Sequence, residues 1–103
     1  MPKKIFTYED ACALLPEVQR LTGVAVDQID AIADDGDDAD PEVYQRIVED
    51  WAQSVMELGI EVKGLWLVDF DSGGGYYCWK HPEPALEYFH GYDEGFAGRV
   101  KLN

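Results

Sequence analysis

The middle of the chain reads LWLVDFDSGGGYYCWK from Leu65 to Lys80, and this stretch decides the fold. Residues 65–70 form a near-continuous apolar run, which is typical of a strand covered on both faces or lying in an interface. Residues 71–75 are an aspartate, a serine and three glycines, which together signal a turn, and residues 76–80 return as a second strand. The stretch therefore predicts a β-hairpin.

The segments after and before this hairpin extend it into a β-meander. Residues 60–62 are a short strand candidate, and residues 85–90 are a further strand candidate that follows a break at HPEP, residues 81–84. Residues 91–103 are punctuated by glycines, so we expect an irregular C-terminal tail. The second half of the chain, residues 59–103, is thus predicted to be a β-meander with a tail.

The first half, residues 1–58, is predicted to be a helical hairpin. Thr7 and Asp10 resemble a capping box, and Phe6 before them could pack onto Ala11. Apolar side chains then recur at helical spacing, at Leu14, Leu15, Val18, Leu21, Ala25, Ile29 and Ile32. Pro16 lies inside this pattern, so either the helix is bent there or a short first turn precedes the main helix.

The second helix of the hairpin has clear start and stop signals. Asp40 is a good N-cap, Pro41 is a good first helical residue, and Gly59 fits a C-cap. One stripe of this helix carries Tyr44, Ile47, Val48, Trp51, Val55 and Leu58. We therefore expect one α+β domain, residues 1–103, in which a two-helix hairpin packs on a small antiparallel β-meander.

The composition limits what this domain can bind. Of its 103 residues 8 are basic and 21 acidic, a net charge of −13, which argues against nucleic acid and against an anionic membrane surface. No apolar run approaches the roughly 20 residues that span a bilayer, and the N-terminal residues lack the apolar region of a signal peptide. Two widely separated cysteines make no disulfide framework, so we expect a cytoplasmic protein.

The charge is concentrated in the helical half, where residues 1–58 carry a net −10. Part of it lies in the loop between the helices, where Asp35, Asp37, Asp38 and Asp40 are candidate ligands for a hard divalent cation. The leading aspartates do not have the spacing of an EF-hand loop, so we favour a solvated connection between helices. The near-neutral second half holds both histidines and is the expected functional surface.

Cys78 and His90 are the candidate catalytic residues. A cysteine nucleophile needs a lowered pKa or an adjacent base. Alternation along a strand puts Trp79 and His81 on the face opposite Cys78, so the base would have to be His90 from the next strand. The alternative is that Cys78 is buried core, which we favour because a cysteine among aromatic residues in a central strand is usually buried.

Polar side chains gather among aromatic ones in the C-terminal half, and the candidate ligand-binding residues are Asp69, Trp79, Glu83, His90, Glu94 and Arg99. In one interpretation Arg99 holds a small anionic ligand and His90 acts as a base. In the other, which we favour, Arg99 pairs with a carboxylate and Phe96 anchors, so that the tail is pinned to the sheet. His90 with Glu94 also suggests a metal site, although the sequence offers no obvious third ligand.

Several short motifs belong to one pattern. They are IFTYEDA at residues 5–11, ALLPE at 13–17, GIEVK at 59–63, LVDF at 67–70, CW at 78–79 and DEGFAGR at 93–99. Together with Glu83 and His90 they resemble a small prokaryotic family catalogued as domain of unknown function 2203, over nearly the whole chain. Where that family tends to have Gly-Glu after the Cys-Trp strand, this chain has Pro82-Glu83. The resemblance implies a cytoplasmic, single-domain protein, and it implies no activity or cofactor.

Three hypotheses stay open for the function. The first is a binding or assembly module that forms a homodimer, because two helices cannot cover both faces of a sheet bearing Trp66, Val68, Phe70, Tyr77 and Trp79. The alternatives are a small enzyme or ligand-binding protein with a polar pocket around Cys78, His90 and Arg99, and a protein that binds a divalent metal. No cofactor is predicted beyond that metal, and neither substrate nor reaction type follows from the sequence.

Overall fold

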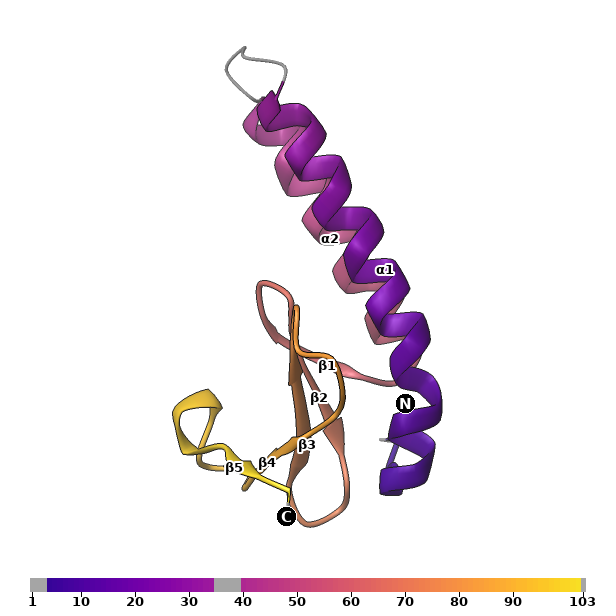
Figure 1. Ribbon diagram of the computed structural model, residues 1–103, viewed down its shortest axis with the longest axis vertical. Helices are drawn as coiled ribbons and strands as arrows, with labels where there is room; N and C mark the ends of the chain where they lie inside the picture. The colour runs from indigo at the N-terminus through magenta and orange to yellow at the C-terminus, as the bar shows by residue number, and fades with distance from the viewer. Residues whose placement is uncertain (1–3, 35–39, 103) are drawn as a thin grey trace.

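The computed structural model describes residues 4–34 and 40–102, in which two helices are followed by a five-stranded antiparallel sheet (Figure 1). The helices are α1 (Tyr8–Asp34) and α2 (Pro41–Glu57), and the strands are β1 (Glu61–Gly64), β2 (Leu67–Asp71), β3 (Tyr76–Lys80), β4 (Tyr88–His90) and β5 (Val100–Lys101). Strands follow one another in the sheet in chain order, and every neighbouring pair is antiparallel. The predicted α+β fold is confirmed.

The helix α1 is one α-helix that runs through Pro16, so no separate first turn precedes it. Its start follows the predicted cap, because the Asp10 N–H donates to Thr7 Oγ1 at 3.0 Å. Phe6 and Ala11 are both buried in the hydrophobic core. Neither described helix is long and apolar enough to cross a membrane.

The second helix also begins and ends as predicted. Asp40 caps α2 by accepting a hydrogen bond from the Glu42 N–H at 2.9 Å, and Pro41 is the first helical residue. Gly59 follows the C-cap Leu58 with φ +88°, the left-handed conformation that glycine favours after a helix. Of the four aspartates considered as cation ligands, Asp35, Asp37 and Asp38 lie outside the described residues.

The core lies between the helices and one face of the sheet. Val68, Phe70 and Trp79 are buried in one hydrophobic cluster with residues of both helices, and Trp66 and Tyr77 pack against it half-buried. All five side chains that were expected to need a partner are therefore covered by the helices of the same chain. These side chains therefore give no argument for a partner, because alternation puts them all on the one face that the helices cover.

The strand boundaries differ from the prediction at the turn between β1 and β2, at the start of β4, which is Tyr88 rather than residue 85, and in the tail. Leu65 and Trp66 form the turn between β1 and β2 rather than the start of a strand, and Trp66 has φ +60°. Its carbonyl accepts a hydrogen bond from the His81 N–H at 3.0 Å, which ties this turn to the end of β3. The tail contains a short 3₁₀ turn, Phe96–Gly98, and the strand β5, neither of which was predicted.

A buried hydroxyl joins the two helices. The Trp51 indole N–H donates to Thr22 Oγ1 at 2.9 Å, and Thr22 Oγ1 donates to the Val18 carbonyl at 2.7 Å. Both Thr22 and Trp51 are buried, so neither the indole N–H nor the hydroxyl can turn to water instead.

We expect Thr22→Val to lower the free energy of unfolding by about 1–2 kcal/mol, because the isosteric change orphans the Trp51 N–H. The measurement is chemical denaturation followed by circular dichroism. In a Trp51→Phe background the same change should cost less, since no indole N–H is left to orphan. Equal losses in the two backgrounds would contradict the role given to this hydrogen bond.

Candidate functional site

Three side chains with metal-ligating atoms meet on the face of the sheet that points away from the helices. They are Asp69 on β2, Cys78 on β3 and His90 on β4, all buried, and their ligand atoms lie within 4.8 Å of one another. Asp69 is the direct cross-strand partner of Cys78, and His90 is the partner of Tyr76, two residues before Cys78. Register and alternation together therefore bring the three side chains to one spot on one face.

Both ring nitrogens of His90 are engaged. Nδ1 lies 2.8 Å from the Gly91 carbonyl oxygen, and Nε2 lies 2.9 Å from Asp69 Oδ2. A carbonyl oxygen can only accept, so Nδ1 carries a proton and donates it. Nε2 and Oδ2 then hold one further proton between them, which fixes the orientation of the imidazole ring.

The Asp69 carboxylate has capacity that the protein leaves unused. Its Oδ1 atom is buried and accepts no N–H or O–H hydrogen bond from the described residues. A buried carboxylate oxygen without a partner costs free energy that a bound cation would recover. Apart from the thiol of Cys78, which hydrogen-bonds to the Asp69 carboxylate, this buried oxygen has no donor among the described residues, which favours a cation at this place.

Cys78 is a thiol at neutral pH in this environment. Burial raises the pKa of the Cys78 thiol to about 12, and the Asp69 carboxylate acts in the same direction through its charge and a hydrogen bond, while Arg99 acts weakly against it. Neither nitrogen of His90 is free to take the proton, because one donates to Gly91 and the other is bonded to Asp69. This arrangement does not activate Cys78 as a nucleophile.

The raised pKa of Cys78 predicts a loss of stability in alkali. An unfolded thiol has a pKa of about 8.5 and loses its proton first, so the folded state binds more protons between about pH 9 and 12. The free energy of unfolding of the metal-free protein should fall through this range, by at most about 1.4 kcal/mol per pH unit. Below about pH 8 this contribution should be fully present.

The control for this titration is Cys78→Ala, measured by denaturation over the same pH series. Ionisation of other groups is common to both proteins, so the advantage of the wild type over the variant should shrink above about pH 9. Parallel curves for the two proteins would show that the pKa of Cys78 is not raised in the folded state.

A cavity of about 310 Å³ opens over the three side chains. Its floor is Asp69, Cys78 and His90, and its walls include Lys63, Leu67, Tyr76, Tyr92, Gly95 and Phe96. Sequence reasoning did not single out Lys63, Tyr76, Tyr92 or Leu67 for this site. The alternation of β2 and β3 contained a signal for Leu67 and Tyr76, whereas Tyr92 reaches the site from the irregular tail.

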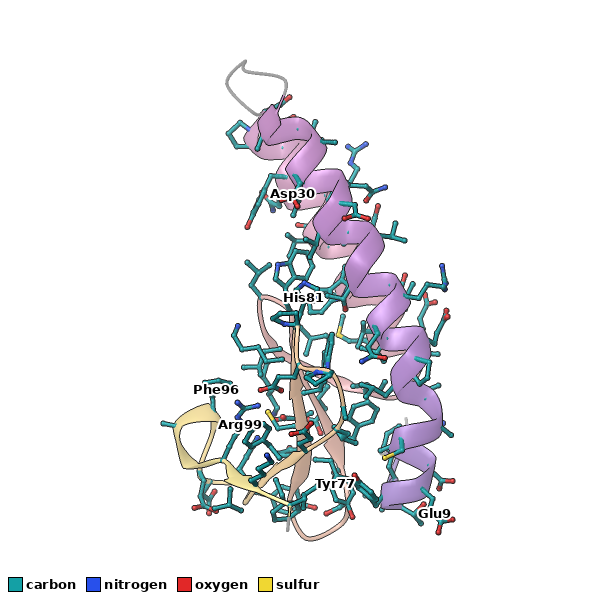
Figure 2. The ribbon with its side chains drawn as sticks, viewed as in Figure 1. Glu9, Asp30, Tyr77, His81, Phe96 and Arg99 are labelled. Atoms are coloured by element: carbon teal, nitrogen blue, oxygen red, sulfur yellow. The ribbon has the colours of Figure 1, made fainter. Side chains whose placement is uncertain are left out.

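The tail is held against the sheet by Arg99. Its guanidinium forms a two-pronged contact with Glu83, with distances of 3.0 Å from Nη1 to Oε1 and 2.8 Å from Nη2 to Oε2. The same group lies over the Tyr88 and Phe96 rings, 4.0 and 4.1 Å from their centroids. Figure 2 shows Arg99 and Phe96 together, where the C-terminal segment meets the sheet face remote from α1.

This geometry agrees with the interpretation that Arg99 pins the tail. Its charge is met by Glu83, whose Oε1 also accepts from the Lys80 N–H at 2.8 Å, so the guanidinium has no free fork for an anionic ligand. Burial alone would lower the pKa of Arg99, but the hydrogen bonds with Glu83 and Cys78 outweigh it and raise that pKa. Arg99 Nη1 also lies 3.9 Å from Cys78 Sγ, which links the tail to the three-residue cluster.

The remaining candidate residues have local structural contacts. Trp79 lies on the core face, and its indole N–H donates to the Glu83 carbonyl at 2.8 Å. Glu94 is exposed and accepts from the Gly91 N–H at 2.9 Å. The structure thus brings together Asp69, Cys78 and His90, and next to them Glu83 and Arg99.

Fold and site define this chain as a small α+β protein whose sheet carries a buried Asp–Cys–His cluster under an aromatic-walled cavity. It belongs to the family described as an uncharacterized conserved protein (DUF2203), whose family model matches residues 4–102. No curated protein and no solved structure matches the chain. The family has no established function, so function must be argued from the site itself.

Proposed function

We propose that this protein binds a transition-metal ion of the Zn²⁺ type through Asp69, Cys78 and His90. The observation that carries the proposal is the buried cluster of one carboxylate, one thiol and one imidazole, with ligand atoms within 4.8 Å of one another. These are the three donor types that zinc takes in proteins. The buried Oδ1 of Asp69, which accepts no N–H or O–H hydrogen bond from the described residues, supports the same conclusion.

The spacing of the donor atoms is close to what such an ion needs. Zinc bonds of about 2.0–2.3 Å in a tetrahedron place ligand atoms about 3.2–3.6 Å apart. His90 Nε2 and Asp69 Oδ2 are 2.9 Å apart, held there by the proton that an ion would displace. The three ligand atoms all lie within 4.8 Å of one another, so side-chain movements of about 1 Å complete three-fold ligation.

The groups around the three ligand side chains also favour metal binding. The hydrogen bond from His90 Nδ1 to the Gly91 carbonyl is the contact that orients a zinc-bound imidazole and leaves Nε2 as its ligand atom. Arg99, 3.9 Å from Cys78 Sγ, favours the thiolate that a metal requires. One thiolate and one carboxylate balance the charge of a divalent ion.

A soft thiolate ligand selects zinc and related ions over calcium and magnesium, which take oxygen ligands. It also requires that Cys78 stay reduced. We therefore propose the cytoplasm as the compartment in which this protein works, since thiols persist there.

The test is metal analysis of the protein purified without a chelator, followed by titration of the metal-free protein with Co²⁺. We expect one ion per chain and the absorption bands of tetrahedral Co²⁺ with a thiolate ligand. Excess Mg²⁺ or Ca²⁺ should leave those bands unchanged. Absence of bound metal together with absence of a thiolate-to-cobalt band would overturn the proposal.

We also propose that two copies associate through the far half of the helical hairpin, which extends beyond the sheet (Figure 1). No described side chain from Val26 to Ala33 or from Asp40 to Asp50 is buried. The apolar stripe nevertheless continues there through Ile29 and Ile32, which are half-buried, and Tyr44, which is 40% exposed. A second copy would cover this stripe as a four-helix bundle.

Charge supports a second copy as the occupant. Arg46 and Asp50 line a groove between α1 and α2, together with Ile47. In an antiparallel two-fold contact of α2 with its copy, Arg46 of one chain can face Asp50 of the other, so the surface complements itself. The net charge of −13 on each chain opposes association at long range, and salt screens that repulsion.

Sedimentation equilibrium tests this association. We expect a dimer that tightens with added salt, a weaker dimer for Arg46→Asp, and recovery in the double variant Arg46→Asp/Asp50→Arg. A monomeric wild type at all salt concentrations, or a double variant as weak as the single one, would overturn the assignment.

A further inference from the structure

The cluster offers three protein ligands and opens into a cavity. Structural zinc sites are closed by four protein ligands, whereas a site with three keeps a position for water or another ligand. The described residues within 4.8 Å contribute three donor atoms, and the cavity lies directly over them. This inference rests on the metal site proposed above and concerns what occupies the remaining position.

We propose that the open position binds the carboxylate of a small organic acid with an aromatic body. The cavity volume of about 310 Å³ is at the small end of ligand pockets. A monocarboxylic acid of this kind would place one oxygen on the metal and its ring among the walls. Three observations carry the assignment: the composition of the walls, the single cation at the rim, and the engagement of Arg99.

The walls favour an aromatic body. Tyr76, Tyr92, Phe96 and Leu67 are four of the residues that line the cavity. Tyr76 and Tyr92 are already in edge-to-face contact, with ring centroids 5.0 Å apart. A flat ring entering beside them can continue this edge-to-face packing, which stabilises aromatic pairs beyond the burial of apolar area.

The charge at the rim favours a single negative charge. Lys63 is the cationic side chain among the described residues that line the cavity. Its Nζ lies 2.9 Å from Glu61 Oε1 and over the Tyr76 ring, 4.6 Å from the centroid, and the hydrogen bond to Glu61 raises its pKa. An ammonium group has three N–H donors, so one carboxylate oxygen of an incoming acid can share it with Glu61.

The other nearby cation cannot serve a second anionic group. The two-pronged contact of Arg99 is with Glu83, and its guanidinium packs on the Tyr88 and Phe96 rings. Glu61 adds negative charge on the same face, because it is the direct partner of the metal-binding Asp69 across β1 and β2. A phosphate ester, with its higher charge, would meet repulsion that a monocarboxylate largely avoids.

The experiment uses the Co²⁺-loaded protein, with benzoate, acetate and imidazole as probes read from the visible bands. We expect all three to shift the bands, with benzoate binding at least about tenfold more tightly than acetate because its ring is buried. Equal affinities for benzoate and acetate would remove the aromatic body from the proposal.

Variants of the rim separate charge from ligation. Lys63→Met should weaken benzoate about three- to tenfold and leave imidazole unchanged, whereas Glu61→Gln should tighten benzoate by a similar factor. The matched control is Lys101→Met, which removes the same charge from a lysine that is paired with Glu87 outside this cavity. Equal effects of the two lysine variants would show a general charge effect and overturn the role of Lys63.

The outcomes also separate this inference from the metal site. Cobalt bands that form but do not respond to any probe would show a metal without an open position, and the inference would fail while the metal site stands. Failure of the bands to form would overturn the metal site itself. Inorganic phosphate that binds more tightly than benzoate would reject the monocarboxylate class.

Discussion

Replacing Cys78 with alanine should weaken the binding of Zn²⁺ or Co²⁺ by at least about a hundredfold. Even the loss of a residue that hydrogen-bonds to a metal ligand lowers metal affinity about ten- to a hundredfold. The change removes the sulfur that makes the site selective for soft metals and leaves one carboxylate and one imidazole. The thiolate-to-cobalt band should vanish completely. Equilibrium titration of the metal-free proteins with a competing chelator measures the affinity.

The chain provides a matched control in Cys12. It is the other free cysteine, half-buried on α1, and lies outside the cluster. Cys12→Ala should leave metal affinity and the thiolate band as in the wild type. Asp69→Asn, which keeps the shape of the side chain but removes its charge, should weaken affinity while retaining the band. Equal affinities for Cys78→Ala and Cys12→Ala would contradict ligation by Cys78.

Local signals were sufficient to predict the helices and the order of the first four strands. The cap at Thr7, the Asp40-Pro41 start of α2 and the glycine turn at residues 73–75 all act over a few residues, and all have the expected structure. The predictions that failed concern positions set by contacts between residues far apart in the sequence. Trp66 was expected in a strand because of its hydrophobicity, but it lies in a turn with its ring 4.8 Å from that of Trp51.

The site could be predicted only in part, for a related reason. His90 and Cys78 were recognised as candidates, and the position of His90 on the strand beside Cys78 was foreseen. Asp69 was also a candidate, but its place in one cluster with Cys78 and His90 was not predicted, because it becomes the direct partner of Cys78 only through the register of β2 with β3. Register depends on which face each strand buries, and here the burial of Val68 and Phe70 sends Asp69 to the other face.

The role of Arg99 in the tail could be predicted from the residues around it. Arg99 was expected to pair with a carboxylate and hold the tail, because one arginine among glycines and aromatic residues suits such a contact. Which carboxylate it meets could not be read from the sequence. The turn after β3 positions Glu83 for this contact, because the Lys80 N–H and the Trp79 indole N–H both donate hydrogen bonds to Glu83.

Replacing Arg99 with methionine should lower the free energy of unfolding by about 3 kcal/mol. The side chains of Arg99 and Glu83 are only 12% and 21% exposed, so the variant leaves a poorly solvated carboxylate without its partner. It also removes the cation from between the Tyr88 and Phe96 rings. Chemical denaturation measures the loss. Relative to the wild type, hydrogen exchange should speed up more in residues 91–99 than in α2.

Two further variants distinguish geometry from charge. Arg99→Lys keeps the charge but has neither the planar fork nor the flat surface that stacks on the rings, so we expect it to recover less than half of the loss. In a Glu83→Gln background, Arg99→Met should cost clearly less than in the wild type, because no charged carboxylate is left unpaired. Full recovery by lysine would mean that Arg99 acts only as a charge, and equal costs in the two backgrounds would mean that Glu83 is not its energetic partner.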